Sequence, residues 1–169
     1  MPDNDPSTPF AHAPAAPPDT GLHAARRRWM SVLARAGADE IAALLGGAPT
    51  LPEHVRLRGP EAGLVMLRGR AGGGGAAFNL GEMTVTRCTV RVADGHVGHA
   101  YVAGRDARQA ELAALLDAAL QDPARHDALQ AMVIAPLAAR QRAARDGIAR
   151  RAAATRVDFF TMATMRTDS

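Results

Sequence analysis

The feature that most constrains the fold is an Asp94-Gly95 pair between two runs rich in Val, Thr and Tyr. A two-residue Asp-Gly loop favours a type I′ turn, so the two runs are predicted to form an antiparallel β-hairpin. One face of the hairpin should be bulky and apolar, whereas Arg87 and Arg91 lie among small residues on the other, which would suit a covering helix or a partner. The expected cross-strand partners are Val92 with Val97, Val90 with His99, Cys88 with Tyr101, and Thr86 with Ala103.

Helices are predicted on both sides of this hairpin. Apolar spacing indicates a helix over residues 22–36 and a short second helix from Asp39 to Leu45, which together form an N-terminal helical hairpin. After the β-hairpin, a helix from about Asp106 to Gln121 should cover the sheet. A further segment begins at the Asp122-Pro123 cap and stops before Pro136, and a long last helix follows.

Extended segments at 55–58 and 64–70, separated by a turn at Gly59-Pro60, precede the hairpin. A run of glycines at 72–75 then leads to a further strand signal at 78–80. A flexible connection is the favoured reading of these glycines, and contact with an anion stays open. The predicted fold class is therefore α+β: a mainly antiparallel sheet of about four strands with a central hairpin, covered by helices, plus the N-terminal helical hairpin and the long C-terminal helix.

Composition limits the size of the core and the number of domains. The 169 residues suffice for one domain at 21–169, preceded by a disordered Pro-rich tail at 1–20. Aromatic residues make up only 4% of the chain, so the core must be built from Ala, Leu, Val and Met. Small side chains bury little apolar area each, so a partner surface is expected to supply part of the stability.

Charge and cysteine content exclude several classes of function. All 20 basic residues are Arg, which excludes a Schiff-base or P-loop lysine, and the net charge of +3 does not by itself indicate nucleic-acid binding. A single cysteine, Cys88, excludes an internal disulfide and a multi-cysteine metal site. No apolar run could span a bilayer, so a cytoplasmic protein without membrane or nucleic-acid partners is expected.

Candidate catalytic groups are few. His96 and His99 are three residues apart on a strand and point to opposite faces, so they are poorly placed to share a metal ion. Cys88 and His99 lie on one face in the expected register, and a thiolate-imidazole pair is geometrically possible. A mid-strand cysteine on an apolar face is more often a small core residue, so no catalytic, cofactor-binding or metal-binding residue is assigned.

The C-terminal segment concentrates residue types that are common at protein interfaces. It holds two of the four Phe residues, close to an arginine and a methionine, which is a mixture enriched at binding hot spots. An alternative is that the segment folds back on its own core. Together with the arginine face of the hairpin, the candidate partner interface comprises Arg87, Arg91, Arg156, Val157, Asp158, Phe159, Phe160 and Met162.

Several segments, in the same order along residues 22–165, resemble PhnG, a subunit family of the bacterial carbon-phosphorus lyase system. The combination is specific although each piece alone is weak, and the family pattern does not depend on a thiol at position 88. The segments are RRRWMSVLARA at 26–36, GLVMLRGRAGGGG at 63–75, FNLGEMTVTRCTVRVADG at 78–95, GRDARQAELAALLDA at 104–118, IAPL at 134–137 and RVDFFTM at 156–162.

The resemblance implies a non-autonomous subunit of a complex for phosphonate catabolism. PhnI would be the principal partner, with PhnH and PhnJ in the core and PhnK and PhnL associated. With PhnH, PhnI and PhnL, the family supports transfer of ribose 5-triphosphate from MgATP to an alkylphosphonate, with release of adenine. An iron-sulfur cluster and S-adenosylmethionine belong to PhnJ. The resemblance therefore implies that this chain scaffolds PhnI, binds no cofactor of its own and is not catalytic in isolation.

Two alternatives belong to other classes. The N-terminal helices and the arginine content permit a small helix-turn-helix-like DNA-binding regulator, although Asp39 and Glu40 would then face phosphate. A free-standing hydrolase would need Cys88 and His99 to act together.

Overall fold

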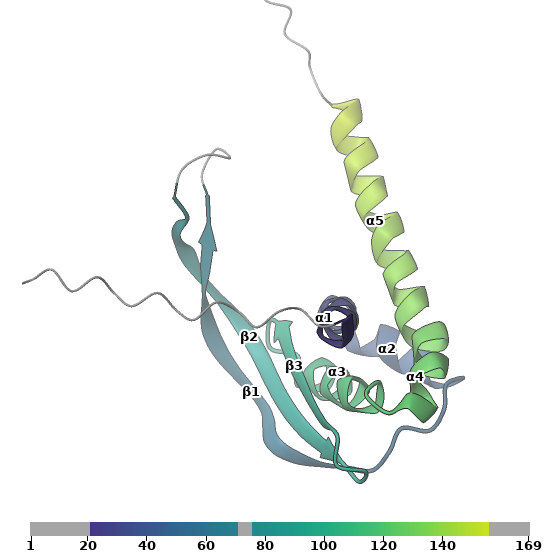
Figure 1. Ribbon diagram of the computed structural model, residues 1–169. Helices are drawn as coiled ribbons and strands as arrows, with labels where there is room; N and C mark the ends of the chain where they lie inside the picture. Colours follow the sequence, from purple (N-terminus) through teal and green to yellow (C-terminus); the bar gives the residue numbers. More distant parts are fainter. Residues whose placement is uncertain (1–20, 71–75, 156–169) are drawn as a thin grey trace, which may run out of the picture.

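The computed structural model describes residues 21–70 and 76–155 and shows a three-stranded antiparallel sheet with helices packed on one face (Figure 1). The α+β class predicted from the sequence is confirmed. The Pro-rich tail, the glycines at 72–75 and the segment from Arg156 onward lie outside the described residues. The elements are α1 (Gly21–Leu33), α2 (Ala38–Leu45), β1 (His54–Gly69), β2 (Phe78–Val92), β3 (Val97–Ala103), α3 (Ala107–Ala119), α4 (Pro123–Leu129), η1 (Gln130–Ile134) and α5 (Ala135–Ala154).

The hairpin that joins β2 and β3 closes at Val92 and His96, which leaves three loop residues, 93–95, instead of the expected two. The backbone N–H of Val92 donates to the carbonyl of His96 at 3.0 Å, and Gly95 donates to Val92 at 2.9 Å. Gly95 has a φ of +94°, the left-handed conformation that closes a three-residue hairpin loop. The extra loop residue shifts the pairing by one, so Arg91 lies opposite Val97 and the expected register is wrong.

This shift exchanges the two faces of β3. On β2, the side chains of Cys88, Val90 and Val92 remain on the buried face, as expected. On β3, the buried residues are Gly98, Ala100 and Val102, whereas His99 and Tyr101 are exposed. Because α3 packs against the small residues, the expectation of a covering helix over the arginine face is wrong for the described part of the chain.

Close approach of α3 explains the small residues. A Cβ atom on Gly98 would lie 1.9 Å from the carbonyl oxygen of Ala114 and 2.5 Å from the amide nitrogen of Ala118. The facing surface of α3 is rich in buried alanines, so helix and strand meet almost backbone to backbone. Asp106 caps this helix by accepting a hydrogen bond from the N–H of Gln109 at 2.9 Å, which confirms its predicted start.

β1 is one strand of 16 residues and not two strands joined by a turn. The pairing with β2 is irregular between Arg56 and Arg58 and again between Arg58 and Glu61, and the second interval contains Gly59-Pro60. β1 lies at the edge of the sheet, where a proline that cannot donate a hydrogen bond is tolerated at a bulge. The strand signal at 78–80 likewise belongs to β2, so the sheet has three strands and not four.

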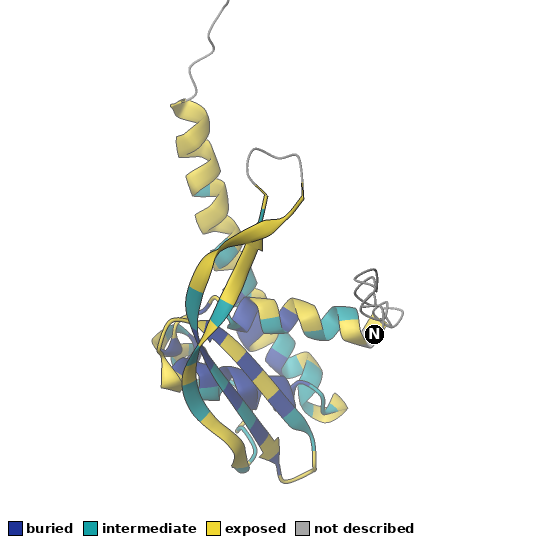
Figure 2. Ribbon diagram, turned by 90° about the vertical axis from the view of Figure 1, so that its left-hand side faces the viewer, coloured by how far each residue is buried: buried dark blue, intermediate teal, exposed yellow. Residues whose placement is uncertain are grey.

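β1 and β2 extend beyond β3 as a two-stranded arm, defined as residues 64–69 and 78–84 (Figure 1). Pairing of β2 with β3 ends at Val85, whereas its pairing with β1 continues to Gly69 opposite Phe78. Much of the arm is exposed in Figure 2. Among the described residues, the arm therefore lacks the third strand and the helical cover that the rest of the sheet has.

α4, η1 and α5 run on as one helical segment, so the predicted break before Pro136 is wrong. The Asp122 carboxylate accepts from the N–H of Ala124 at 2.9 Å, as the predicted cap requires. A proline has no N–H for the usual bond four residues back. The π-helical turn absorbs this loss, because Ala135 donates to Gln130, five residues back.

The predicted N-terminal helical hairpin is confirmed as α1 and α2. Both helices contribute side chains to the core, which lies on the helix-covered face of the sheet. Trp29 is buried there, with its ring edge to face against His126 at 5.5 Å between centroids. Within the described ranges, no helix combines the length and apolarity needed to cross a membrane. The largest fully buried apolar side chains are Leu33, Ile41, Leu116, Leu120, Leu129, Leu137, Val90, Val102 and Val133.

A buried carboxylate joins α1, α3 and β3. Asp117 is fully buried and accepts hydrogen bonds from the guanidinium of Arg26 at 3.0 and 2.6 Å and from the indole N–H of Trp29 at 2.9 Å. It also accepts from the backbone N–H of His99 at 2.9 Å. Each carboxylate oxygen thus has two donors, which offsets the cost of removing the charge from water.

Gly98→Ala should lower the free energy of unfolding by about 2–3 kcal/mol, because α3 must move away from β3 to make room for the methyl group. Urea denaturation would measure the change. Gly63→Ala is the matched control, since a Cβ there meets nothing within 4 Å and should change stability by less than about 1 kcal/mol. Equal losses for both variants would contradict close packing at Gly98.

Asp117→Ala should cost about 3 kcal/mol, because it leaves a buried indole N–H and a backbone N–H without an acceptor and Arg26 without a counter-ion. Asp39→Ala is the control, because the Asp39 side chain is 95% exposed and its pair with Arg108 should contribute less than about 1 kcal/mol. Similar denaturation midpoints for the two variants would disprove a central role for Asp117.

Candidate interaction surfaces

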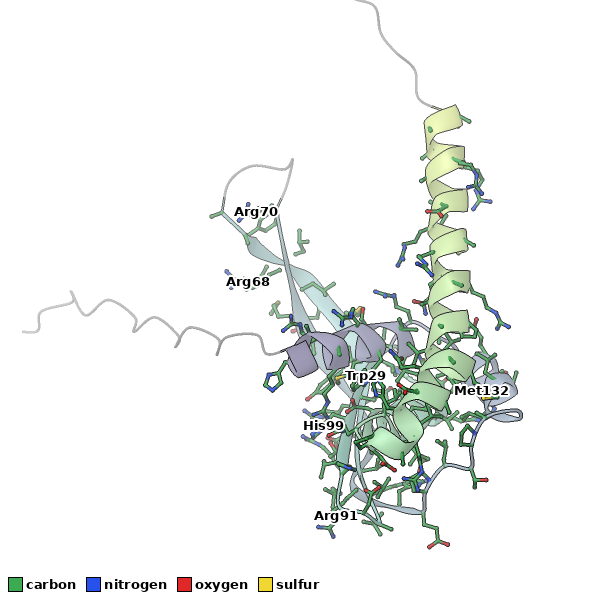
Figure 3. The ribbon with its side chains drawn as sticks, turned by 45° about the vertical axis from the view of Figure 1, so that its right-hand side comes forward. Trp29, Arg68, Arg70, Arg91, His99 and Met132 are labelled. Carbon is green, nitrogen blue, oxygen red and sulfur yellow. The ribbon has the colours of Figure 1, made fainter. Side chains whose placement is uncertain are left out.

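The two arginines predicted on the hairpin lie on the open face of the sheet. The Nε of Arg87 donates to Glu61 at 2.7 Å, and Arg58 binds the same carboxylate. Hydrogen bonds from Arg58 and then Arg87 lower the pKa of Glu61. Arg91 is exposed beside the hairpin loop (Figure 3). Arg87 is therefore engaged within its own sheet, whereas Arg91 has no ion pair among the described residues.

The C-terminal members of the candidate interface are not tested by the structure. Arg156, Val157, Asp158, Phe159, Phe160 and Met162 lie outside the described residues.

The structure separates the candidate thiol and imidazole. Cys88 is 1% exposed, and its Sγ lies 3.5 Å from the carbonyl oxygen of Arg58. Burial raises the pKa of this thiol, so it stays protonated near neutral pH. His99 is exposed on the opposite face with its Nδ1 3.2 Å from the hydroxyl of Thr89. Cys88 and His99 were expected on the same face of the hairpin, but the one-residue shift in pairing places them on opposite faces. The hydrolase alternative therefore has no catalytic pair at these two residues.

Other polar groups of the body form structural pairs. Arg56 donates to both oxygens of Glu111 at 2.7 and 2.8 Å, and His54 lies 3.1 Å from the same carboxylate. The hydrogen bond from Arg56 is the main cause of the lowered pKa of Glu111. These contacts join β1 to α3. Within 21–70 and 76–155, no group of three His, Cys, Asp or Glu side chains is arranged to hold a metal ion.

The short second helix is poorly suited to DNA. α2 carries Asp39 and Glu40 in its first turn and contains no basic residue. Asp39 pairs with Arg108 at 2.6 Å and Glu40 with Arg140 at 3.3 Å, so both acids connect α2 to neighbouring helices. A recognition helix would instead present donors and basic groups to base edges and phosphates.

The arm presents the largest group of exposed apolar side chains on neighbouring strands. Leu64 is 64% exposed and Leu80 59% exposed, and Leu80 lies so close to Gly69 that a Cβ there would approach its Cδ1 to 2.4 Å. The sequence predicts extended segments here but not that they are exposed. The exposure arises because the pairing of β3 with β2 ends at Val85 and does not continue into the arm. The exposed apolar residues of the arm are Leu64, Met66, Leu67, Phe78 and Leu80.

α5 packs only at its base. Near the start of the helix, Leu137 is buried, and Gln141 donates through its Nε2 to the carbonyl of Val32 at 2.9 Å. Beyond this point the helix projects from the body, and Ile148 is 59% exposed (Figures 1 and 2). The arm and α5 are therefore two extended projections with few contacts to the body.

Comparisons with known proteins show which family this chain resembles. The chain matches the family model described as "Phosphonate metabolism protein PhnG" over residues 24–165. It is also similar to a curated protein of Rhizobium meliloti (strain 1021), "Alpha-D-ribose 1-methylphosphonate 5-triphosphate synthase subunit PhnG". The two are 48% identical over 147 residues, which cover 85% of this chain and 91% of the relative. The matched range includes the whole sheet, the arm and α5.

Proposed function

Because this chain belongs to the PhnG family, we propose that it is a non-autonomous subunit of the synthase that forms alpha-D-ribose 1-methylphosphonate 5-triphosphate in phosphonate metabolism. Its role in that complex is to hold a catalytic subunit in place. The observation that carries this proposal is the apolar arm, which nothing in residues 21–70 and 76–155 covers. Uncovered apolar strands promote aggregation of a free monomer, whereas in a subunit of a complex the same surface can bind a partner.

The distribution of polar groups supports a scaffold in preference to an enzyme. The buried carboxylate of Asp117 is fully paired within the fold, and Cys88 is a protonated core thiol. His99 stands on the open sheet face, away from both groups. The described residues therefore lack a nucleophile and base within reach of each other, so we assign the reacting groups to other subunits.

PhnI is the proposed principal partner, with PhnH and PhnJ in the same core and PhnK and PhnL associated with it. In this scheme, a phosphonate displaces adenine from MgATP with PhnH, PhnI and PhnL, in the cytoplasm. The later cleavage uses the iron-sulfur cluster and S-adenosylmethionine of PhnJ. The arm and α5 give this subunit two separate surfaces, so it can contact PhnI at more than one place.

Leu64→Glu and Leu80→Glu should each prevent co-purification with PhnI and reduce adenine release by the reconstituted complex by at least about tenfold, because a charge is placed in an apolar contact. Leu57→Glu is the matched control, since Leu57 is 50% exposed on the same strand but outside the arm. All three chains should melt alike when isolated. Retained association of the arm variants would contradict docking through the arm.

The C-terminal segment can be tested in the same co-purification assay. Replacing both Phe159 and Phe160 by alanine should weaken association with PhnI by at least about tenfold if these rings dock on the partner. Replacing Thr167 and Asp168 by alanine controls for changes near the chain end. Unchanged association of the phenylalanine variant would remove this segment from the interface.

A further inference from the structure

α1 and α5 form the walls of a groove near the base of α5. The helices contact each other near Trp29, which Figure 3 labels beside α5. Val32, Ile134 and Ala138 contribute to an apolar floor, and the groove has a volume of about 670 Å³. This volume lies in the usual range for sites that hold small ligands, roughly 300–1,000 Å³.

Four arginines line this groove, and we call it the arginine groove. Arg28 comes from α1, and Arg35 comes from the turn that directly follows this helix. Arg142 and Arg145 come from α5 and are three residues apart, which places them on one side of that helix. The two pairs belong to segments more than a hundred residues apart in the chain, and the fold brings them to one depression.

The arginine groove is poorly neutralised. Among the described residues, Arg28, Arg142 and Arg145 have no carboxylate within ion-pair distance, and Arg35 donates only to the side-chain oxygen of Gln141 at 3.3 Å. Asp127 is the one acidic residue in its lining. Elsewhere on the body, pairs with carboxylates are made by Arg26, Arg56, Arg58, Arg87, Arg108, Arg125 and Arg140.

A second observation concerns Gln130, which also lines the groove. Its side-chain oxygen is buried and has no hydrogen-bond partner in the described structure. A buried acceptor without a donor costs free energy, and a ligand hydroxyl can supply that donor once the Gln130 side chain turns its oxygen toward the groove. The groove therefore combines an excess of guanidinium groups with one unsatisfied acceptor.

We propose that the arginine groove binds an oligophosphate ester, with its phosphate chain between Arg28 and Arg35 on one wall and the two arginines of α5 on the other, and a hydroxyl of its organic part near Gln130. Guanidinium groups recognise phosphate oxygens through paired, charge-assisted hydrogen bonds, and several phosphates in a row match arginines on two opposite walls. The binding site goes beyond the scaffold role and does not depend on it, because each residue it uses lies in this chain.

Titration of the full-length chain with ATP tests this proposal. Trp29 is the only tryptophan in the sequence and lines the groove, so its fluorescence reports occupancy, and calorimetry gives the affinity. Replacing Arg142 and Arg145 together by glutamine should weaken ATP binding by at least about tenfold. Replacing Arg150 and Arg151 by glutamine removes the same charge from the same helix outside the groove and should leave affinity within about twofold.

Further ligands separate the contributions to binding. Tripolyphosphate should bind several-fold more weakly than ATP, AMP more weakly still, and a hexaglutamate peptide not measurably. Equal affinity for tripolyphosphate and ATP would overturn the hydroxyl contact, and strong binding of hexaglutamate would show an acidic-peptide surface instead. Equal losses in the two double variants, or no binding of ATP, would overturn the site itself. The ATP titration does not measure association with PhnI. The scaffold role is tested separately, by the co-purification assay.

Discussion

The fold depends on one buried charge. Asp117 lies in the last turn of α3 and receives donors from α1 and from the backbone of β3, so its position sets the relation of three elements. A buried carboxylate is tolerated only when each oxygen has donors, and here Arg26, Trp29 and His99 provide them. Gln121 adds two bonds of 2.9 Å, to the carbonyls of Val97 and Asp117, at the same junction. The helices are therefore fixed by directed bonds as well as by apolar packing.

Because α1 and α3 are held against one face of the sheet, the two faces differ in burial. On the covered face, Gly98 and the alanines of α3 allow close packing and a small, dense core. On the other side, Tyr101 and the arm have no cover within the described chain, and α5 projects beyond the body. A core with few aromatics and projections with exposed apolar groups are together typical of a subunit that completes its burial against partners.

The sequence predicted the elements better than their pairing. The caps at Asp106 and Asp122 and the apolar spacing of α1 and α3 are local signals, and the structure confirms them. The predicted register of β2 and β3 was wrong because Asp94-Gly95 is compatible with hairpin loops of two or three residues. Packing under α3 selects the longer loop, since only that register places Gly98 where the helix backbone approaches. Likewise, Pro60 and Pro136 predict an end to the strand and to the helix. In the structure, an irregularity in the edge strand accommodates Pro60, and the π-helical turn accommodates Pro136.

The α+β class, the hairpin, the helix starts at Asp106 and Asp122 and the PhnG family could all be predicted from the amino-acid sequence, because they rest on short-range spacing and on the order of motifs. The tertiary structure decided which face of β3 is buried, where β3 ends beside the arm, and that Arg28 and Arg145 meet across one groove. Those properties depend on contacts between segments far apart in the chain. No local pattern encodes them, because burial is a property of the assembled neighbours and not of the residue alone.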